Sequence, residues 1–342
     1  MRQNPFSLYD FLGYVFPGAL SLILLCFFVE LNEVHSVTQI YKSIGEFLKG
    51  VRPEQTNGAS AVSGTLFFLE ETVIWTIVAY VVGHIVAYLS SVTVEKFAIW
   101  TYGYPSEFLL GPVPSLHYWK VNECCDGIQP TCWKEFIEFA WRIFIGLFLL
   151  PISLCSLVFG KVLGMKSFFV KPLDKTLRET IDANKNKLAE SLHITIHEGD
   201  DFHRVIYHYE YERQPNHVQK MDNYVALYGF LRAMTFIADC ATLWIVIRYV
   251  LPDFSSIAEI DWHLVLMVAM CIAITYTFFM AFMKFYRRFT LESFMCLVID
   301  PSFKETRTIP YNYVPTEGMQ EPTAPLSITP SSTQTLTNGP VS

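Results

Sequence analysis

WHLVLMVAMCIAITYTFFMAFM, residues 262–283, contains no Asp, Glu, Lys or Arg. A helix needs roughly 20 apolar residues to cross the hydrocarbon layer of a bilayer, so this run predicts a membrane-spanning helix. It ends at Lys284, Arg287 and Arg288, and it follows an acidic turn, 252–261, that holds no Lys or Arg. By the positive-inside tendency, we expect the turn to lie outside the cell and the C-terminus to lie in the cytoplasm.

Composition places the whole chain in the same class. Of its 342 residues, 52% are hydrophobic and 15% are aromatic, which is typical of a membrane protein. The net charge is -7 and the basic residues are scattered, so we expect the lipid bilayer as a partner and not nucleic acid. No CxxC pair, phosphate loop, dinucleotide-binding glycine motif, nucleophile elbow or HExxH motif is present. The sequence therefore predicts neither a cofactor nor an enzyme.

The hydrophobic pattern predicts an all-α membrane protein with about four transmembrane helices, one re-entrant or in-plane apolar element and a small, mainly helical cytoplasmic region. The predicted segments are a first transmembrane helix (1–30), an extracytoplasmic loop with an amphipathic helix (31–71), a second transmembrane helix (72–95), an interfacial cytoplasmic loop (96–135), a re-entrant or third transmembrane segment (136–163), a cytoplasmic region (164–222), a transmembrane hairpin with an amphipathic extension (223–299) and a disordered tail (300–342).

Segment 136–163 leaves the number of spans open. It is long enough to cross a bilayer, but Pro151 interrupts it and basic residues flank it on both sides. Positive charge on both flanks favours an element that begins and ends in the cytoplasm. In that case there are four spans and both termini are cytoplasmic. If the segment crosses, there are five spans and the N-terminus lies outside.

Three polar residues fall inside predicted spans. Arg232 and Asp239 are seven residues apart, which places them two turns apart on one face of a helix. His84 lies near the middle of the second predicted span. Ionisable groups in a membrane are costly unless they are paired. We therefore expect structural pairing, with an ion pair or hydrogen bond between His84 and Asp239 as the simplest form. A role in transport, proton movement or gating is the alternative.

A second group of candidates comes from the five histidines between His193 and His217. His193, His197, His203 and His208 lie close to several acidic residues, a composition that can bind a metal or sense pH. The residues between His193 and His197 are Ile-Thr-Ile, which favours extended backbone and separates the two rings by about 13 Å. A solvated surface of mixed charge is therefore the expected reading, with a metal site as the alternative.

Several short segments resemble a loose group of uncharacterised bacterial multi-pass membrane proteins. These segments are SLYDFLGYVFPGALSL (7–22), GHIVAYLSS (83–91), GYPS (103–106), YGFLRAM (228–234) and KFYRRF (284–289). The resemblance implies a location in the bacterial inner membrane and implies no particular reaction.

These features predict a non-enzymatic sensor, scaffold or accessory subunit that couples the cytoplasmic region 164–222 to a helix bundle. A second copy of the chain or another protein would bind through that region. The alternative is an oligomeric channel or a membrane-disrupting effector that lines a pore with His84, Arg232 and Asp239. A membrane-bound enzyme with a metal at the histidines is a third reading.

Overall fold

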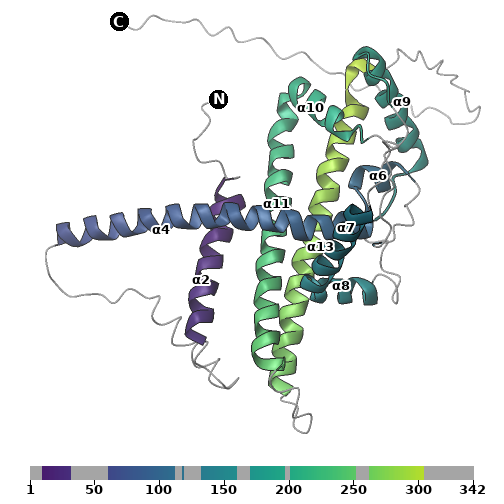
Figure 1. Cartoon of the computed structure of the whole chain (residues 1–342). Coiled ribbons are helices and arrows are strands. Elements are labelled where there is room, and N and C mark those ends of the chain that lie inside the picture. Colours follow the sequence, from purple (N-terminus) through teal and green to yellow (C-terminus); the bar gives the residue numbers. More distant parts are fainter. Residues whose placement is uncertain are drawn as a thin grey trace, which may run out of the picture. The chain divides into compact units, whose positions relative to one another are not determined.

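The structure, a computed structural model, describes residues 10–31, 61–111, 118, 132–159, 170–196, 201–251 and 262–303. Within these ranges all regular elements are helices, which confirms the all-α part of the prediction. The α-helices are α2 (Phe16–Leu31), α4 (Ala61–Ser90), α5 (Lys96–Tyr102), α6 (Pro105–Leu110), α7 (Cys132–Phe148), α8 (Leu150–Leu157), α9 (Lys175–Ser191), α10 (His203–Arg213), α11 (Pro215–Ile245) and α13 (Trp262–Ile299) (Figure 1). Short π-helical turns are η1 (Phe11–Val15), η2 (Ser91–Glu95) and η5 (Val246–Val250), and η6 (Pro301–Phe303) is a 3-10 turn.

Four stretches of helix are long and apolar enough to span a membrane, as the sequence predicts. They are Phe11–Val29, Thr72–Leu110, His217–Val250 and Trp262–Ile299. Their outward faces carry large apolar side chains; Ile77 is 58% exposed and Leu266 is 60% exposed. Contiguous apolar surface of this kind is unfavourable in water and natural against lipid tails.

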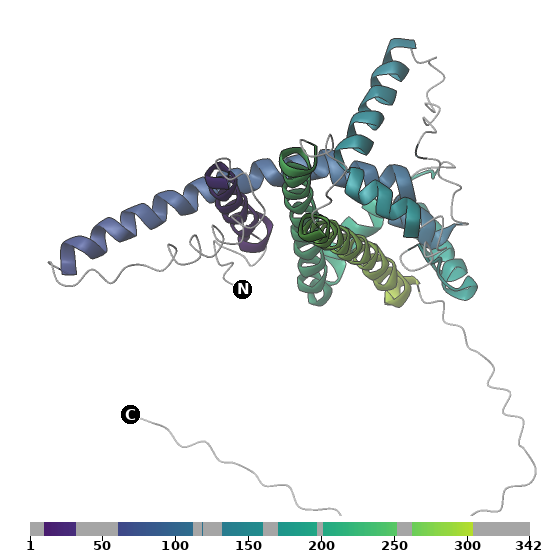
Figure 2. The same cartoon turned by 90° about the horizontal axis from the view of Figure 1, so that it is seen from below.

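Helices α11 and α13 lie side by side along most of their length, and both views show this pairing (Figures 1 and 2). Near the middle of α13, Phe279 and Phe282 are fully buried in the main apolar core. Between the same two helices, the hydroxyl oxygens of Thr242 and Thr275 lie 3.1 Å apart, and both side chains are buried. A hydrogen bond between small polar side chains is a common way for membrane helices to associate.

Helix α4 crosses α2 at two glycines. An ideal Cβ on Gly18 would lie 2.7 Å from the backbone nitrogen of Gly83, and closer still to the carbonyl oxygen of Ala79. A Cβ on Gly83 would lie 2.9 Å from the Cα atom of Tyr14. The two backbones can meet only because neither glycine carries a side chain.

The direction of α4 differs from that of the other long helices. It passes across α2 and α11 and does not run beside them (Figures 1 and 2). The four helices therefore do not share one direction. If α11 and α13 lie along the membrane normal, α4 lies closer to the plane of the membrane. The length and composition of α4 are those of a membrane span, but its direction differs from that of the other three candidate spans.

Helices α7 and α8 form the bent pair that segment 136–163 predicts. Glu135–Phe148 and Leu150–Leu157 meet at 86°, a geometry that fits a re-entrant loop or a broken span. The side chain of Arg142 fixes α7 to the preceding segment: its Nη1 donates to the carbonyl oxygen of Tyr118 at 2.6 Å, and its guanidinium lies 5.0 Å from the ring centroid of Trp100. These contacts hold α7, the first helix of the bent pair, against the rest of the protein.

Several predicted boundaries are wrong. Residues 61–71, expected in a loop, are helical because α4 begins at Ala61. Residues 96–110, also expected in a loop, form α5 and α6, since Pro105 occupies the first turn of α6, where proline is tolerated. Helix α11 begins at Pro215, before the predicted start of the hairpin at 223. The predicted amphipathic helix within 31–60 and the tail from 304 onward lie outside the described residues.

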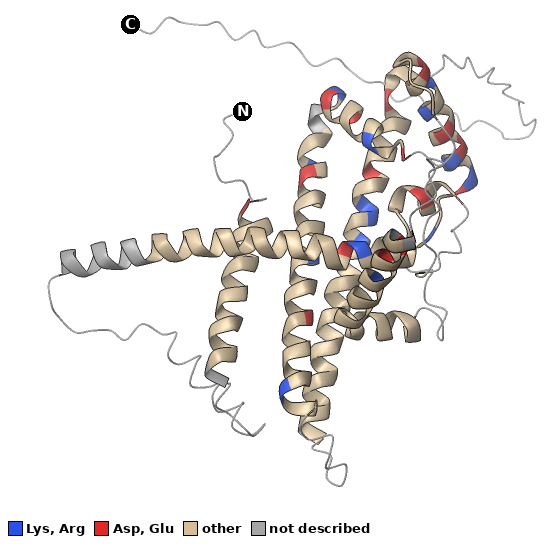
Figure 3. Ribbon diagram, viewed as in Figure 1, with Lys and Arg blue, Asp and Glu red and all other residues tan. Residues whose placement is uncertain are grey.

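Charged residues gather over α9, α10 and the adjoining ends of α11 and α13 (Figure 3). The last turns of α13, predicted to be an amphipathic extension, bury Phe294 and Leu297 in the core that α9 and α10 share. Nδ2 of Asn184 on α9 donates to the carbonyl oxygen of Leu297 at 3.1 Å. The polar segment between the spans is thus packed directly onto the last long helix.

Candidate functional site

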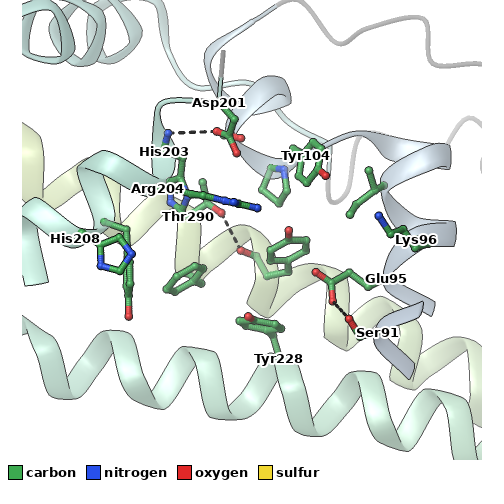
Figure 4. Close-up of a pocket in the computed structure, with 16 residues that line it drawn as sticks. Ser91, Glu95, Lys96, Tyr104, Asp201, His203, Arg204, His208, Tyr228 and Thr290 are labelled. Carbon is green, nitrogen blue, oxygen red and sulfur yellow. Dashed lines mark hydrogen bonds between the residues drawn. The ribbon is translucent and has the colours of Figure 1, made fainter. Parts of the chain in front are cut away.

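A cavity of about 340 Å³ lies where the polar segment meets the long helices. Side chains from η2, α5, α6, α10, α11 and α13 line it (Figure 4). The lining residues are Ser91, Glu95, Lys96, Ile99, Tyr104, Pro105, Ser106, Asp201, His203, Arg204, Tyr207, His208, Tyr228, Tyr286, Phe289 and Thr290. Elements far apart in the sequence therefore build one polar chamber at the end of the apolar bundle.

An ion pair closes one side of the cavity. The carboxylate of Glu95 on η2 pairs with the guanidinium of Arg232 on α11, and their side chains are 21% and 15% exposed. Ser91, one turn earlier on η2, donates its hydroxyl to the same Glu95 oxygen at 3.3 Å. Nη2 of Arg232 also donates to the carbonyl oxygen of Ala87 at 3.4 Å. Glu95 and Arg232 are neutralised by each other, and the pair joins α11 to the segment that follows α4.

The opposite side of the cavity is the start of α10. The Asp201 side chain accepts a hydrogen bond from the backbone N–H of His203 at 3.2 Å, which satisfies one of the amides at that helix end. The His203 ring packs edge-on against Phe289 and Phe294 of α13. Burial lowers the pKa of His203 to about 4, and the nearby Asp201 carboxylate opposes that shift only in part. The imidazole is therefore neutral near pH 7.

Two further cations extend into the chamber from different elements. Lys96 comes from α5 and Arg204 comes from α10, and Figure 4 shows both reaching toward the space between them. Tyr104, Tyr228 and Tyr286 also line this space. The arrangement is suited to binding an anion, because cationic groups and hydroxyl donors converge on one volume.

The structure separates the three intramembrane candidates. Arg232 pairs with Glu95. His84 is exposed on α4 and stacks on Tyr14, with ring centroids 3.9 Å apart. Asp239 is fully buried, and neither of its carboxylate oxygens has a hydrogen-bond partner among the described residues. The hypothesis that Asp239 pairs with His84 is wrong, and Arg232 pairs with Glu95, which was not among the candidates.

The four histidine candidates do not form a cluster in the described part of the chain. His193 is exposed after the end of α9, with a φ of 55°, and His197 lies outside the described residues. His203 and His208 both line the cavity, His203 partly buried and His208 exposed. Two of the four thus belong to the site, as lining residues.

A different group, which the sequence analysis did not single out, has the spacing of metal ligands. His217 on α11 and Glu292 and Cys296 on α13 offer donor atoms that all lie within 4.8 Å of one another. The ammonium of Lys220 already pairs with the Glu292 carboxylate. The Lys220 ammonium would compete with a metal ion for the Glu292 carboxylate. We therefore interpret the group as part of an ion pair, Lys220 with Glu292, that joins α11 to α13.

Glu95 and Lys96 cannot be recognised as site residues from the sequence, because they resemble the ordinary charged flank of a span. The partner of Glu95 is 137 positions away in the chain, and no local pattern links the two. Comparison with known proteins adds no further guide: no protein-family model, no curated protein and no solved structure matches this chain.

Proposed function

We propose that this chain is a multi-pass membrane sensor in which the cavity links the polar region 164–222 to the bundle of long helices. The observation that carries the proposal is the shared wall of the cavity: Glu95, Lys96 and Tyr228 come from the apolar stretches, whereas Asp201 and Arg204 come from the polar segment. A ligand that contacts both sides stabilises the arrangement in which they are close, and so shifts the population of that arrangement.

The proposed route of coupling runs from the cavity through α10 to α13. His203 contributes to the cavity and also packs on Phe289 and Phe294 of α13. A change in cavity occupancy would therefore alter how firmly α10 is held. The charged outer face of α9, which is exposed, is the surface that we propose contacts a protein partner or a second copy of the chain.

Filling the cavity with a side chain tests the coupling without any ligand. Ser91 lines the cavity from η2 and is half-buried, so we expect Ser91→Trp to place an indole in the chamber and to slow hydrogen exchange of the α10 amides by about tenfold. Exchange would be followed by mass spectrometry on the full chain in nanodiscs. Thr76→Trp is the matched control, because Thr76 is exposed on α4, far from the cavity lining in sequence. Equal exchange of α10 in the two variants would contradict the coupling.

We also propose an inner-membrane location with the polar region and the C-terminus in the cytoplasm. The support is the basic cluster after residue 283 and the acidic turn 252–261. In a variant whose eight native cysteines are serine, a membrane-impermeant maleimide added to intact cells should label Ser256→Cys. It should label Lys175→Cys, whose native side chain is 84% exposed, only after permeabilisation. Labelling of Lys175→Cys in intact cells would place the polar region outside.

A further inference from the structure

We infer that the cavity binds a phosphate-bearing ligand about the size of a lipid headgroup, held between Lys96 and Arg204. The inference rests on the proposed function, since it names what the shared cavity would sense. It follows from three features of the described residues: which charges are already paired, where the unpaired cations lie, and how much space separates them.

The two carboxylates of the cavity already have donors within the protein. Glu95 is paired with Arg232 and accepts from Ser91, and Asp201 accepts the backbone N–H of His203. Lys96 and Arg204, in contrast, make no hydrogen bond or ion pair within the part of the chain that the structure describes. Arg232 balances the charge of Glu95, so the two exposed cations Lys96 and Arg204 are set against the single negative charge of Asp201, and the excess positive charge suits an anion.

The two cations approach the same space from separate elements. Lys96 comes from α5, next to the long apolar stretch, and Arg204 comes from α10 (Figure 4). A tetrahedral phosphate can accept from a guanidinium on one side and from an ammonium on the other, whereas a planar carboxylate offers fewer oxygens. The hydroxyl of Tyr104, which also lines the cavity, adds a neutral donor.

The size of the cavity limits the ligand. About 340 Å³ is near the lower end of the range for small-molecule sites, so the space suits a glycerophosphate-sized group. The cavity lies at the end of apolar helices, where a phospholipid headgroup could enter from the bilayer, and it also contacts the polar segment, where a soluble phosphate ester could enter. Both sources supply the same chemistry.

Titration calorimetry on the full chain in a neutral detergent would test the inference. The probes are dioctanoyl phosphatidic acid, glycerol 3-phosphate, inorganic phosphate and uncharged dioctanoylglycerol. We expect saturable binding of at least one phosphate compound, weakened about tenfold or more by Lys96→Gln and by Arg204→Gln. Lys175→Gln is the matched control, because it removes the same charge from an exposed position on α9, and it should bind as the native chain does.

The probes separate the two sources. Binding of phosphatidic acid alone identifies a lipid headgroup, and binding of glycerol 3-phosphate or inorganic phosphate identifies a soluble ligand; either result supports the inference. Equal binding of dioctanoylglycerol, no saturable binding of any phosphate, or binding that neither cavity variant weakens would overturn it. The proposed coupling can fail while the ligand inference holds. That is the outcome if Lys96→Gln and Arg204→Gln weaken phosphate binding but Ser91→Trp does not change hydrogen exchange of the α10 amides. The sensor function would then be refuted, and the phosphate site would stand.

Discussion

Gly83→Ala should lower the free energy of unfolding by about 3 kcal/mol, the upper range for overpacking a close contact. The new methyl group would lie 2.9 Å from the Cα atom of Tyr14, and closer still to its carbonyl group. These are backbone atoms, so no change of rotamer relieves the overlap. Helix α2 must move away from α4, and the contacts around the crossing are lost with it. The measurement is the thermal unfolding midpoint of the purified chain in detergent.

Gly229→Ala provides the matched control for this experiment. Gly229 lies inside α11, and an added Cβ there would meet no atom within 4 Å. Alanine is favoured over glycine in a helix by roughly 0.5–1 kcal/mol, so this variant should unfold at the same temperature as the native chain or slightly above it. If the two alanine variants unfold together, the glycines do not mark a close helix crossing.

The second large effect concerns pH and the contact between α10 and the end of α13. Glu210 is 1% exposed, and both of its carboxylate oxygens lack a hydrogen-bond partner among the described residues. Burial, reinforced by the nearby Asp300 carboxylate, raises the pKa of Glu210 from its ordinary value of 4.5 to about 7; the Arg213 guanidinium and the Gln214 side chain oppose this shift. The folded chain therefore holds a proton that the unfolded chain releases.

The direction of the pH dependence follows from that difference. Below pH 4.5 both states are protonated at Glu210, and above pH 7 both are ionised. Between these values, stability falls as pH rises, because the folded state binds more protons than the unfolded state. The shift corresponds to a loss on the order of 3 kcal/mol across the window. Thermal unfolding of the native chain at pH 5, 6, 7 and 8 would measure it.

Glu210→Gln isolates the contribution of this group. Glutamine has nearly the same shape and does not titrate, so the variant should be much less sensitive to pH between 5 and 7 than the native chain. Glu179→Gln, on the exposed surface of α9, should retain the native pH dependence. A native chain whose stability does not fall over this interval would show that Glu210 is solvated or paired.

The sequence could predict the long helices but not their contacts. An uncharged run such as 262–283 can be recognised as a candidate span without knowledge of the rest of the fold, because the criterion is length and composition. The partner of Arg232 could not be named from the sequence, because Glu95 lies 137 positions away and packs there only in three dimensions. The apolar runs also contain Gly18 and Gly83, but nothing in the sequence indicates that they face each other.

The cavity was beyond prediction for the same reason. His203 and His208 were singled out as possible metal ligands, but their position across the cavity from Lys96 depends on how α10 packs onto α13. The short helix α6 was not foreseen either, since Pro105 begins it within a segment that was expected to be a loop. Local sequence thus predicts the helices, whereas the residues that line the cavity are known only from how those helices pack together.

The π-helical turn η2, which carries Ser91 and Glu95, affects how this chain tolerates a change in length. Such a turn contains one residue more than the α-helical turn in its place. Deleting one residue from 91–95 would leave an uninterrupted α-helical rod, but would rotate everything after it by about 100° relative to α4. Lys96 would swing away from Arg204. A natural variant one residue shorter here would therefore keep its long apolar helices but would no longer bring Lys96 and Arg204 to the same cavity.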